Sequence, residues 1–450
     1  MIKKSTLIVL LCAIVITGGV YFFQWRKSKQ PATSADTSKP AFSVSASDIV
    51  AFSIAHPAQK DRPAIDFEKQ NGSWQIVQPV DTLADQPTAE GFVDQIAESR
   101  PTGTEPITPD HRKAFGLEPP AASLEFTAKG GQKHTLLLGD KDFSGNDVYA
   151  IVDDQPKVSL MPLSLLTTAD KPLNGLRDMN VTHADSADIS SFTLKNPSGA
   201  LALTRDSKDS TLWNFTQPEK VAADPDVVDG ILDAVSNARI SEIVSEKPDD
   251  LARYGLARPA ITFTASKNGG SQTSLVIGKK VGEEYYARDL SRPMIFKVKQ
   301  DLYSKLADTF AQIRDKSVVH LDETSLNRIQ LQNSYGTIEI SRQGTDRQWK
   351  IDTPATEKGK NASSWKILNP FTSLRADEVI DHPSAAQLAK MKDPADTAVF
   401  TSSNGQAITI RISKPSAGVA YAQSSQRPEL FKIKKQTVDD LNLKPSDVAF

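Results

Sequence analysis

The chain of 450 residues contains a single cysteine, Cys12, which lies in its first apolar run. No disulfide and no cysteine-based metal site can therefore form within the chain, although either redox compartment stays open. The six histidines also lack a metal-binding pattern, because none stands four residues from another histidine, as in zinc-binding helices. We therefore expect no metal site.

The motifs typical of hydrolases and of nucleotide-binding proteins are missing too. Neither the G-x-S-x-G nucleophile motif nor the GxxxxGK[ST] phosphate loop occurs, and Gly278-Lys-Lys280 is interpreted as a hairpin turn. With 53 basic and 55 acidic residues the net charge is −2, and no basic stripe with interleaved aromatic residues offers a surface to nucleic acid. We expect no catalytic residue, no cofactor and no nucleic-acid partner, and predict that the protein is not an enzyme.

The first feature that is present is an uncharged run from Thr6 to Phe23. As a helix it would extend about 27 Å, enough to cross the apolar part of a bilayer. After a short head at residues 1–5 we predict a transmembrane anchor over 6–25 and a flexible linker over 26–46, rich in Ser, Ala, Thr and Pro. A cleaved signal peptide is the alternative interpretation of the same run.

The orientation of this anchor does not follow from charge, because lysine or arginine residues flank both of its ends. The short head and the signal-like start favour a cytoplasmic N-terminus. We therefore expect a single-pass protein of the inner (cytoplasmic) membrane, with the bulk of the chain on the periplasmic side.

The rest of the chain repeats one pattern three times. A tryptophan is followed five residues later by proline at Trp74, Trp213 and Trp349. The spacing between these three tryptophans is the length of a domain and not of a solenoid turn. We predict repeat units at 47–181, 185–320 and 324–450. The third is divergent, because Lys390-Met391 replaces a Gly-Leu pair and Ser413 stands where Gly139 and Gly278 stood.

Each unit combines alternating apolar stretches, which indicate strands, with short helical patterns. Asn71-Gly72 predicts a hairpin before the tryptophan strand. Asp85, Asp224 and Asn361 mark the start of a helix with one apolar face. Proline and glycine bracket a two-turn helix within 108–117 and within 247–256, and a further helix is expected over 302–313. The fold class is α+β: tandem units with largely antiparallel sheets and helices packed on one side.

A few repeated polar or aromatic residues are weak candidates for contacts with a partner. The tryptophans are expected in the core, since large aromatic side chains dominate burial. In each unit one arginine follows the predicted helix. For these arginines we favour a simple interaction with the helix dipole over a partner contact. Three tyrosines, each followed by alanine, are the better surface candidates. These candidates are Arg100, Arg239, Arg375, Tyr149, Tyr286 and Tyr421.

Four motifs together resemble a bacterial family, domain-of-unknown-function family 4340. They are the tryptophan strand that ends in proline, the Tyr-Gly-Leu-x-x-Pro box at 254–259, the Leu-x-Ile-Gly strand at 275–278 and the closing Arg-Asp pair. The resemblance covers nearly all of residues 46–320 and, more weakly, the third unit. It implies an anchored envelope protein linked with ABC transport systems of the gliding-motility type, without assigned catalytic residues.

Three functions stay open at this point. The first is a membrane-anchored, non-catalytic envelope protein that acts as a binding or accessory component, with ABC transporter subunits as the partner that the resemblance implies. The second is a solute- or lipid-binding protein with a cleft between repeat units. The third is an envelope enzyme, for which the sequence shows no set of candidate catalytic residues.

Overall fold

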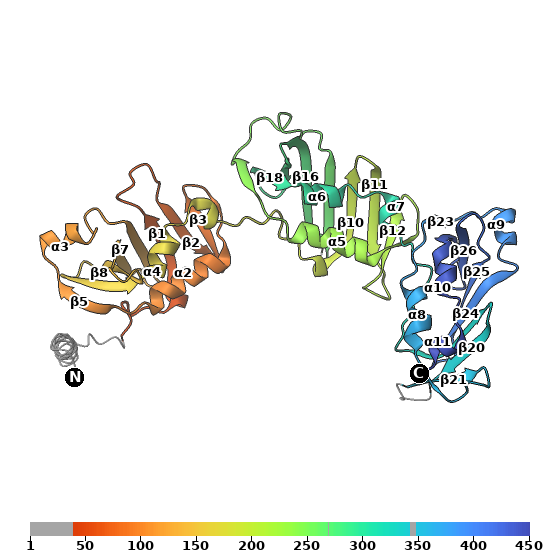
Figure 1. Ribbon diagram of the computed structural model, residues 1–450. Coiled ribbons are helices and arrows are strands. Elements are labelled where there is room, and N and C mark those ends of the chain that lie inside the picture. Colours follow the sequence, from red (N-terminus) through yellow and green to blue (C-terminus); the bar gives the residue numbers. More distant parts are fainter. Residues whose placement is uncertain (1–38, 269, 343–347) are drawn as a thin grey trace, which may run out of the picture. The chain divides into compact units, whose positions relative to one another are not determined.

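A computed structural model describes residues 39–268, 270–342 and 348–450, and Figure 1 shows the arrangement of their helices and strands. They form three repeated nine-stranded antiparallel sheets with short helices, so the chain is mostly β with some α. The predicted tandem repeat is confirmed. The chain divides after Met179 into two compact units, of which the first holds one sheet and the second holds two.

The predicted head (1–5) and transmembrane anchor (6–25) lie outside the described residues, as does the linker up to residue 38. Among the residues that the structure describes, no helix is long and apolar enough to cross a membrane.

The first sheet has the strand order β4-β3-β2-β1-β6-β7-β8-β9-β5. Its strands are β1 (Ile49–Ala55), β2 (Ile65–Gln70), β3 (Ser73–Gln78), β4 (Thr82–Leu83), β5 (Thr102–Pro106), β6 (Ala122–Ala128), β7 (Lys133–Lys141), β8 (Asp147–Val152) and β9 (Lys157–Pro162). Its α-helices are α2 (Gln86–Glu98), α3 (Pro109–Ala114) and α4 (Leu163–Ala169). Short 3-10 helices lie at Ala46–Asp48 and Leu173–Gly175.

The second sheet repeats this order as β13-β12-β11-β10-β15-β16-β17-β18-β14. Its strands are β10 (Ile189–Asn196), β11 (Gly199–Arg205), β12 (Trp213–Gln217), β13 (Ala222–Ala223), β14 (Glu242–Ser245), β15 (Ile261–Lys267), β16 (Gln272–Val281), β17 (Glu284–Asp289) and β18 (Ile295–Lys299). Its helices are the 3-10 helix Ser186–Asp188, α5 (Pro225–Ser236), α6 (Gln300–Leu306) and α7 (Phe310–Ile313).

The third sheet follows as β22-β21-β20-β19-β24-β25-β26-β27-β23. Its strands are β19 (Leu326–Asn333), β20 (Gly336–Ser341), β21 (Trp349–Thr353), β22 (Asn361–Ala362), β23 (Glu378–Ile380), β24 (Pro394–Ser402), β25 (Ala407–Ser413), β26 (Val419–Ser424) and β27 (Leu430–Lys434). Its helices are α8 (Ser364–Thr372), α9 (Ala385–Ala389), α10 (Lys435–Asp440) and α11 (Pro445–Val448).

Each sheet is built from two meanders that meet in the middle. Strands β1 to β4 form one meander, β6 to β9 form the other, and β1 pairs with β6 at the centre. Helix α2 follows the edge strand β4 and leads to β5, the strand at the opposite edge, so the helix connects the two edges of the sheet. In the second sheet α5 has the same place and lies beside α6 over the strands (Figure 1).

The repeated tryptophans lie in the core, as predicted. Trp74, Trp213 and Trp349 occupy the same strand of each sheet and are 1%, 1% and 6% exposed. A cation covers each indole ring: Lys69 Nζ, Arg205 Cζ and Arg342 Cζ lie 5.6, 4.6 and 5.0 Å from the ring centroids of Trp74, Trp213 and Trp349. The three tryptophans therefore have matching surroundings, which supports descent of the sheets from one unit.

The prediction that helices pack on one side is only partly right. In the first sheet, helices α2 and α4 pack on the face that carries Leu136, Leu138 and Ala150. The segment that contains α3 lies on the opposite face, where Phe115 and Leu117 pack against Leu137 and Ile151. Successive side chains of a strand alternate between faces, and strands β7 and β8 are apolar on both, so each face is covered.

Three predicted helix boundaries are wrong. Residues 251–255 form turns instead of a helix, although the Asp250 carboxylate accepts hydrogen bonds from the amides of Ala252 and Arg253 as an N-cap would. The helix expected over 302–313 is two helices, α6 and α7, since Thr309 and Gln312 form a new capping box. Asn361 lies in β22, and Ser363 is the N-cap of the third long helix.

In the first two sheets a glycine in a strand allows a loop to approach closely, and this contact is changed in the third sheet. A Cβ at Gly139 would lie 2.2 Å from the carbonyl oxygen of Phe115, and one at Gly278 would lie 2.3 Å from that of Tyr254. The loop that ends at Gly116 or Gly255 thus presses its backbone against the strand. In the third sheet Ser413 takes the strand position and Lys390 takes the loop position. The strand glycine and the loop glycine are therefore replaced together.

The third sheet also buries a carboxyl group that the other sheets lack. Asp396 is 3% exposed and pairs with Ile412, whereas Ala122 and Ile261 occupy the matching position in the first and second sheets. Among the described residues, the Asp396 side chain has no hydrogen-bond partner at Oδ2. Burial raises the pKa of Asp396 to about 6, because the charged form is poorly solvated there.

Asp396→Ala is expected to stabilise the third sheet by about 3 kcal/mol at pH 7.5 and to change little at pH 4. Since the folded pKa of Asp396 lies above its ordinary value of 3.8, stability falls as pH rises from about 4 to about 6 and stays lowered above that. Urea denaturation of both proteins at the two pH values measures the effect. A gain that is equal at both pH values would contradict this explanation.

Candidate functional site

A short segment joins the second and third sheets by backbone hydrogen bonds to both. The amide of Asp315 donates to the carbonyl of Ala222 in β13 over 3.0 Å. On the other side the amide of Val318 donates to Leu374, and the carbonyl of Lys316 accepts from Ala376. Residues 315–318 are therefore held by backbone hydrogen bonds on both sides, and we call this place the junction.

A buried ion pair lies at the centre of the junction. The Asp315 side chain is 1% exposed, and its Oδ2 lies 2.7 Å from Arg427 Nη1 and 2.9 Å from His320 Nε2. Its Oδ1 accepts a hydrogen bond from the amide of Ser317, and Arg427 donates another to the carbonyl of Ser317. Each oxygen of Asp315 thus has a partner.

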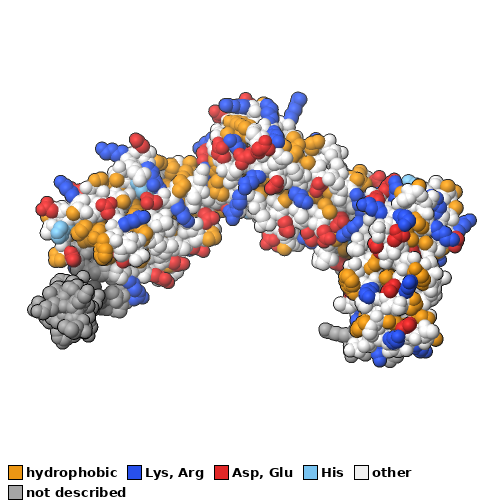
Figure 2. All heavy atoms as spheres, in the orientation of Figure 1, with side chains coloured by type: hydrophobic (Ala, Val, Ile, Leu, Met, Phe, Trp, Pro, Cys, Tyr) orange, Lys and Arg blue, Asp and Glu red, His pale blue; other side chains and the backbone are white. Residues whose placement is uncertain are grey.

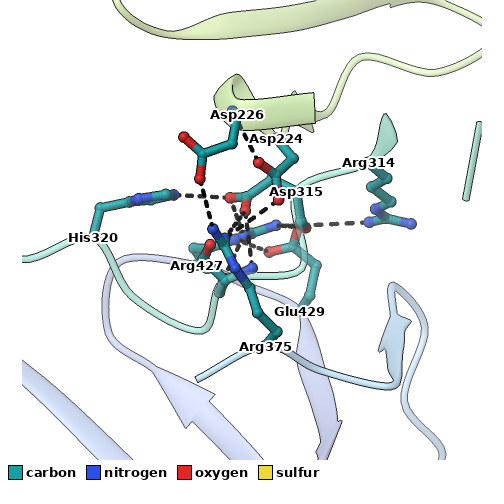
Figure 3. A network of polar contacts seen from close by, with 9 residues as sticks. Asp224, Asp226, Arg314, Asp315, His320, Arg375, Arg427 and Glu429 are labelled. Atoms are coloured by element: carbon teal, nitrogen blue, oxygen red, sulfur yellow. Dashed lines mark hydrogen bonds and ion pairs between the residues drawn. The ribbon is translucent and has the colours of Figure 1, made fainter. Parts of the chain in front are cut away.

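Two further arginines connect the sheets around this pair (Figure 3). Arg375, from the third sheet, reaches Asp224 and Asp226 at the start of α5, each at 3.4 Å, and Asp315 at 3.6 Å. Arg314, from the second sheet, donates two hydrogen bonds to Asp381 of the third, one of them 2.7 Å long. Arg314 and Arg427 also share Glu429, at 3.6 and 3.0 Å.

The charges of the junction are matched to this geometry. Burial alone would raise the pKa of Asp315, but hydrogen bonds from His320 and Ser317 and the charge of Arg427 outweigh it, so the pKa lies below its ordinary value. The hydrogen bond from Arg314 lowers the pKa of Asp381 in the same way. Asp315 and Asp381 are therefore charged at neutral pH, and their ion pairs hold the second sheet against the third.

Acid is expected to loosen the junction. The pKa values of Asp315 and Asp381 lie below their ordinary value of 3.8, so their contribution to stability is present above pH 3.8 and is lost as pH falls below it. Hydrogen exchange at the amides of Asp315 and Val318, corrected for the intrinsic pH effect, should be faster at pH 3 than at pH 5. Equal protection at both pH values would show that the carboxylates do not hold the junction.

The predicted contact candidates are not gathered in one place. Arg375 alone lies in the junction, with its guanidinium directed at carboxylates and not at its own helix end, so the dipole interpretation does not describe it. Arg239 lies on the surface of the second sheet, three residues after α5, and Arg100 is exposed two residues after α2.

The three tyrosines are half-buried, and each packs within its own sheet. Tyr149 stacks on Phe115 at 4.1 Å, Tyr286 meets Tyr254 edge-on at 5.0 Å, and Tyr421 lies 5.1 Å from Lys390 Nζ. Their shared position therefore reflects packing against the segment before the sixth strand of each unit, and their role as partner contacts stays a prediction.

Sequence reasoning missed most of the junction, although a signal existed. The Arg314-Asp315 pair, with a histidine five residues on, repeats Arg177-Asp178 and His183. Arg292 repeats Arg427 structurally, since it donates to the carbonyls of Asn180 and Val181 as Arg427 donates to that of Ser317. Polar residues repeated at fixed spacing near a unit boundary could have pointed to the contact.

Within 39–268, 270–342 and 348–450, no three His, Asp or Glu side chains converge in a way that could hold a metal ion. The sequence model of one family, described as a domain of unknown function (DUF4340), matches residues 74–212 and again 213–394. Both matched segments begin at a repeated tryptophan and not at the first strand of a sheet. No curated protein matches the chain.

Proposed function

The chain belongs to the DUF4340 family, and we propose that this member is a membrane-anchored, non-catalytic envelope protein that binds a partner as an accessory component. The observation that carries the proposal is the junction. The charged side chains of the junction are engaged with one another, across two sheets, instead of facing a cavity. Such a constellation is suited to fixing a surface and not to acid–base chemistry, for which a group must reach the substrate.

A fixed pair of sheets is useful for recognition because little freedom is lost on binding. The side chains on the visible faces are of mixed charge, with acidic and basic groups interspersed (Figure 2). A partner would therefore recognise shape and local polar pattern more than a field of one sign. This favours a protein partner over nucleic acid.

Location and partner class rest on the sequence. The uncharged run at 6–25 supports a single-pass anchor in the inner membrane, with the sheets on the periplasmic side. The resemblance to envelope proteins linked with ABC transport systems suggests transporter subunits as the partner. Both statements belong to the proposal.

Affinity purification of the full chain from membranes in mild detergent tests this function. We expect a stoichiometric membrane-protein partner with the intact chain, and weaker recovery of the same partner when Arg427→Gln loosens the junction. Asp226→Asn, which changes an exposed group of the same network, is the matched control and should retain the partner. Purification of the chain alone under all conditions, or hydrolytic activity of the pure protein on envelope substrates, would overturn the proposal.

A second candidate, binding of a solute or lipid, is favoured by one observation. A depression on the second sheet combines apolar and basic side chains. It lies within a single sheet and not in the cleft between units that the sequence suggested.

A further inference from the structure

The depression lies where α5, α6 and the end of β18 meet, and its volume is about 350 Å³. Ala234, Val298 and Leu302 give it apolar walls, and Val298 and Leu302 are themselves buried. Arg239, Lys299 and Lys305 stand around its rim. The volume is within the range of small-molecule sites.

The rim cations form no hydrogen bond or ion pair among the described residues, although the charge of Lys305 acts on the nearby carboxyl group of Asp308. Arg239, Lys299 and Lys305 are exposed, and no hydrogen bond or ion pair joins their side chains to the part of the chain that the structure describes. Arg375, at the position that matches Arg239 in the third sheet, is instead surrounded by carboxylates. Among the described residues, Asp301 is the acidic residue in the lining and Asp308 lies near Lys305, so three cations face two carboxyl groups and the rim retains a positive excess.

The three cations occur together only in the second sheet. The residues that match Arg239, Lys299 and Lys305 are Arg100, Pro162 and Thr168 in the first sheet, and Arg375, Lys434 and Asp440 in the third. A position that differs between copies of one fold is free of the packing demands that the copies share. The basic rim is therefore not required to build the sheet.

Lys305 is placed to close one side of the depression. Its Nζ lies 3.9 Å from the position that a Cβ at Gly230 would occupy. The ammonium group thus reaches from α6 toward α5, where Gly230 carries no side chain that would displace it. A ligand that enters between the helices would meet this charge and that of Lys299.

We propose that this depression binds an anionic amphiphile, a phosphate or carboxylate attached to a short apolar chain. The rim would hold the anion by charge-assisted hydrogen bonds, and the apolar walls would bury the first part of the chain. Inorganic phosphate lacks the apolar part and a neutral amphiphile lacks the charge, so each should bind poorly. The same chemistry occurs in a soluble single-chain ligand and in an anionic membrane lipid.

The test uses the full chain in nanodiscs of phosphatidylcholine, with octyl phosphate as the probe. Isothermal titration should show saturable binding, and hydrogen exchange should slow in α5 and α6. Octyl glucoside and inorganic phosphate should bind at least tenfold more weakly. Equal binding of either compound would overturn the proposal.

Variants assign the binding to the rim. Lys299→Glu with Lys305→Glu is expected to weaken octyl phosphate binding by 30-fold or more. Lys220→Glu is the matched control, because it makes the same change at an exposed residue between β12 and β13, at the opposite edge of the sheet. Its affinity should be unchanged. If the double variant keeps its thermal midpoint and binds normally, the proposal is wrong.

A final arm separates the two sources of the ligand. Phosphatidylglycerol added to the nanodiscs should protect α5 and α6 and compete with octyl phosphate if the ligand is a membrane lipid. Protection by free octyl phosphate alone would assign a soluble ligand. Either result supports the site, and the absence of protection by both would overturn it. The outcome does not depend on whether a transport partner is found.

Discussion

Replacing Asp315 with alanine is expected to destabilise the junction by about 3–5 kcal/mol, because it removes the fully buried member of an ion pair. Arg427, whose side chain is 11% exposed, would keep only Glu429 and backbone carbonyls as acceptors. Hydrogen exchange of the full chain at the amides of Asp315 and Val318 measures the loss directly. A local readout is needed because a chain of several sheets need not unfold in one step.

The control for this change is Asp226→Ala. Asp226 contacts Arg375 at 3.4 Å, but its side chain is 85% exposed, so its removal is expected to cost less than about 0.5 kcal/mol. The two variants remove a carboxylate from the same network and differ mainly in burial. Similar losses for both would show that burial of the Asp315–Arg427 pair does not determine the strength of the junction.

The second large effect is expected at Gly139, where alanine should destabilise the first sheet by about 2–3 kcal/mol through overpacking. The added Cβ would lie 2.2 Å from the Phe115 carbonyl oxygen. That oxygen also accepts a hydrogen bond from the amide of Asp140 at 2.9 Å, so the loop could not withdraw without breaking it. Thermal denaturation followed by circular dichroism measures the change.

The same substitution at Gly91 is its matched control. Gly91 lies in α2 of the same sheet, with no atom within 4 Å of the added Cβ. Gly91→Ala should therefore stabilise by about 0.5–1 kcal/mol, because alanine is the better helix former. Destabilisation by both changes would indicate that the backbone contact at Gly139 is not the cause.

The parts of the fold that were predicted correctly depend on local patterns. Asn71 and Gly72 both have positive φ, as the hairpin between β2 and β3 requires. Asp85 and Asp224 cap α2 and α5 through their carboxylates. Each of these features is determined by a few neighbouring residues. The edge strand β5, whose five residues are all exposed, shows no apolar alternation and was not predicted.

The junction could not be predicted in the same way. Arg314 and Asp381 are 67 positions apart, and Asp315 and Arg427 are 112 apart. Single charged residues at such separations have no periodicity that a sequence reveals. Only the repetition of Arg-Asp, histidine and arginine at similar spacing carried information. The depression on the second sheet was equally invisible, since Arg239 and Lys305 become neighbours only through packing of α5 on α6.

In each of the three units, the segment before the first strand is attached by the same kind of backbone hydrogen bond. The amide of Ala41 donates to Ser99, that of Val181 to Ala238, and that of Val318 to Leu374. An amide and a carbonyl are present at almost every position, so this attachment asks little of the amino-acid sequence. Duplication of a whole unit therefore preserves this attachment without any matched side chains, and between the second and third sheets the charged residues of the junction add to it.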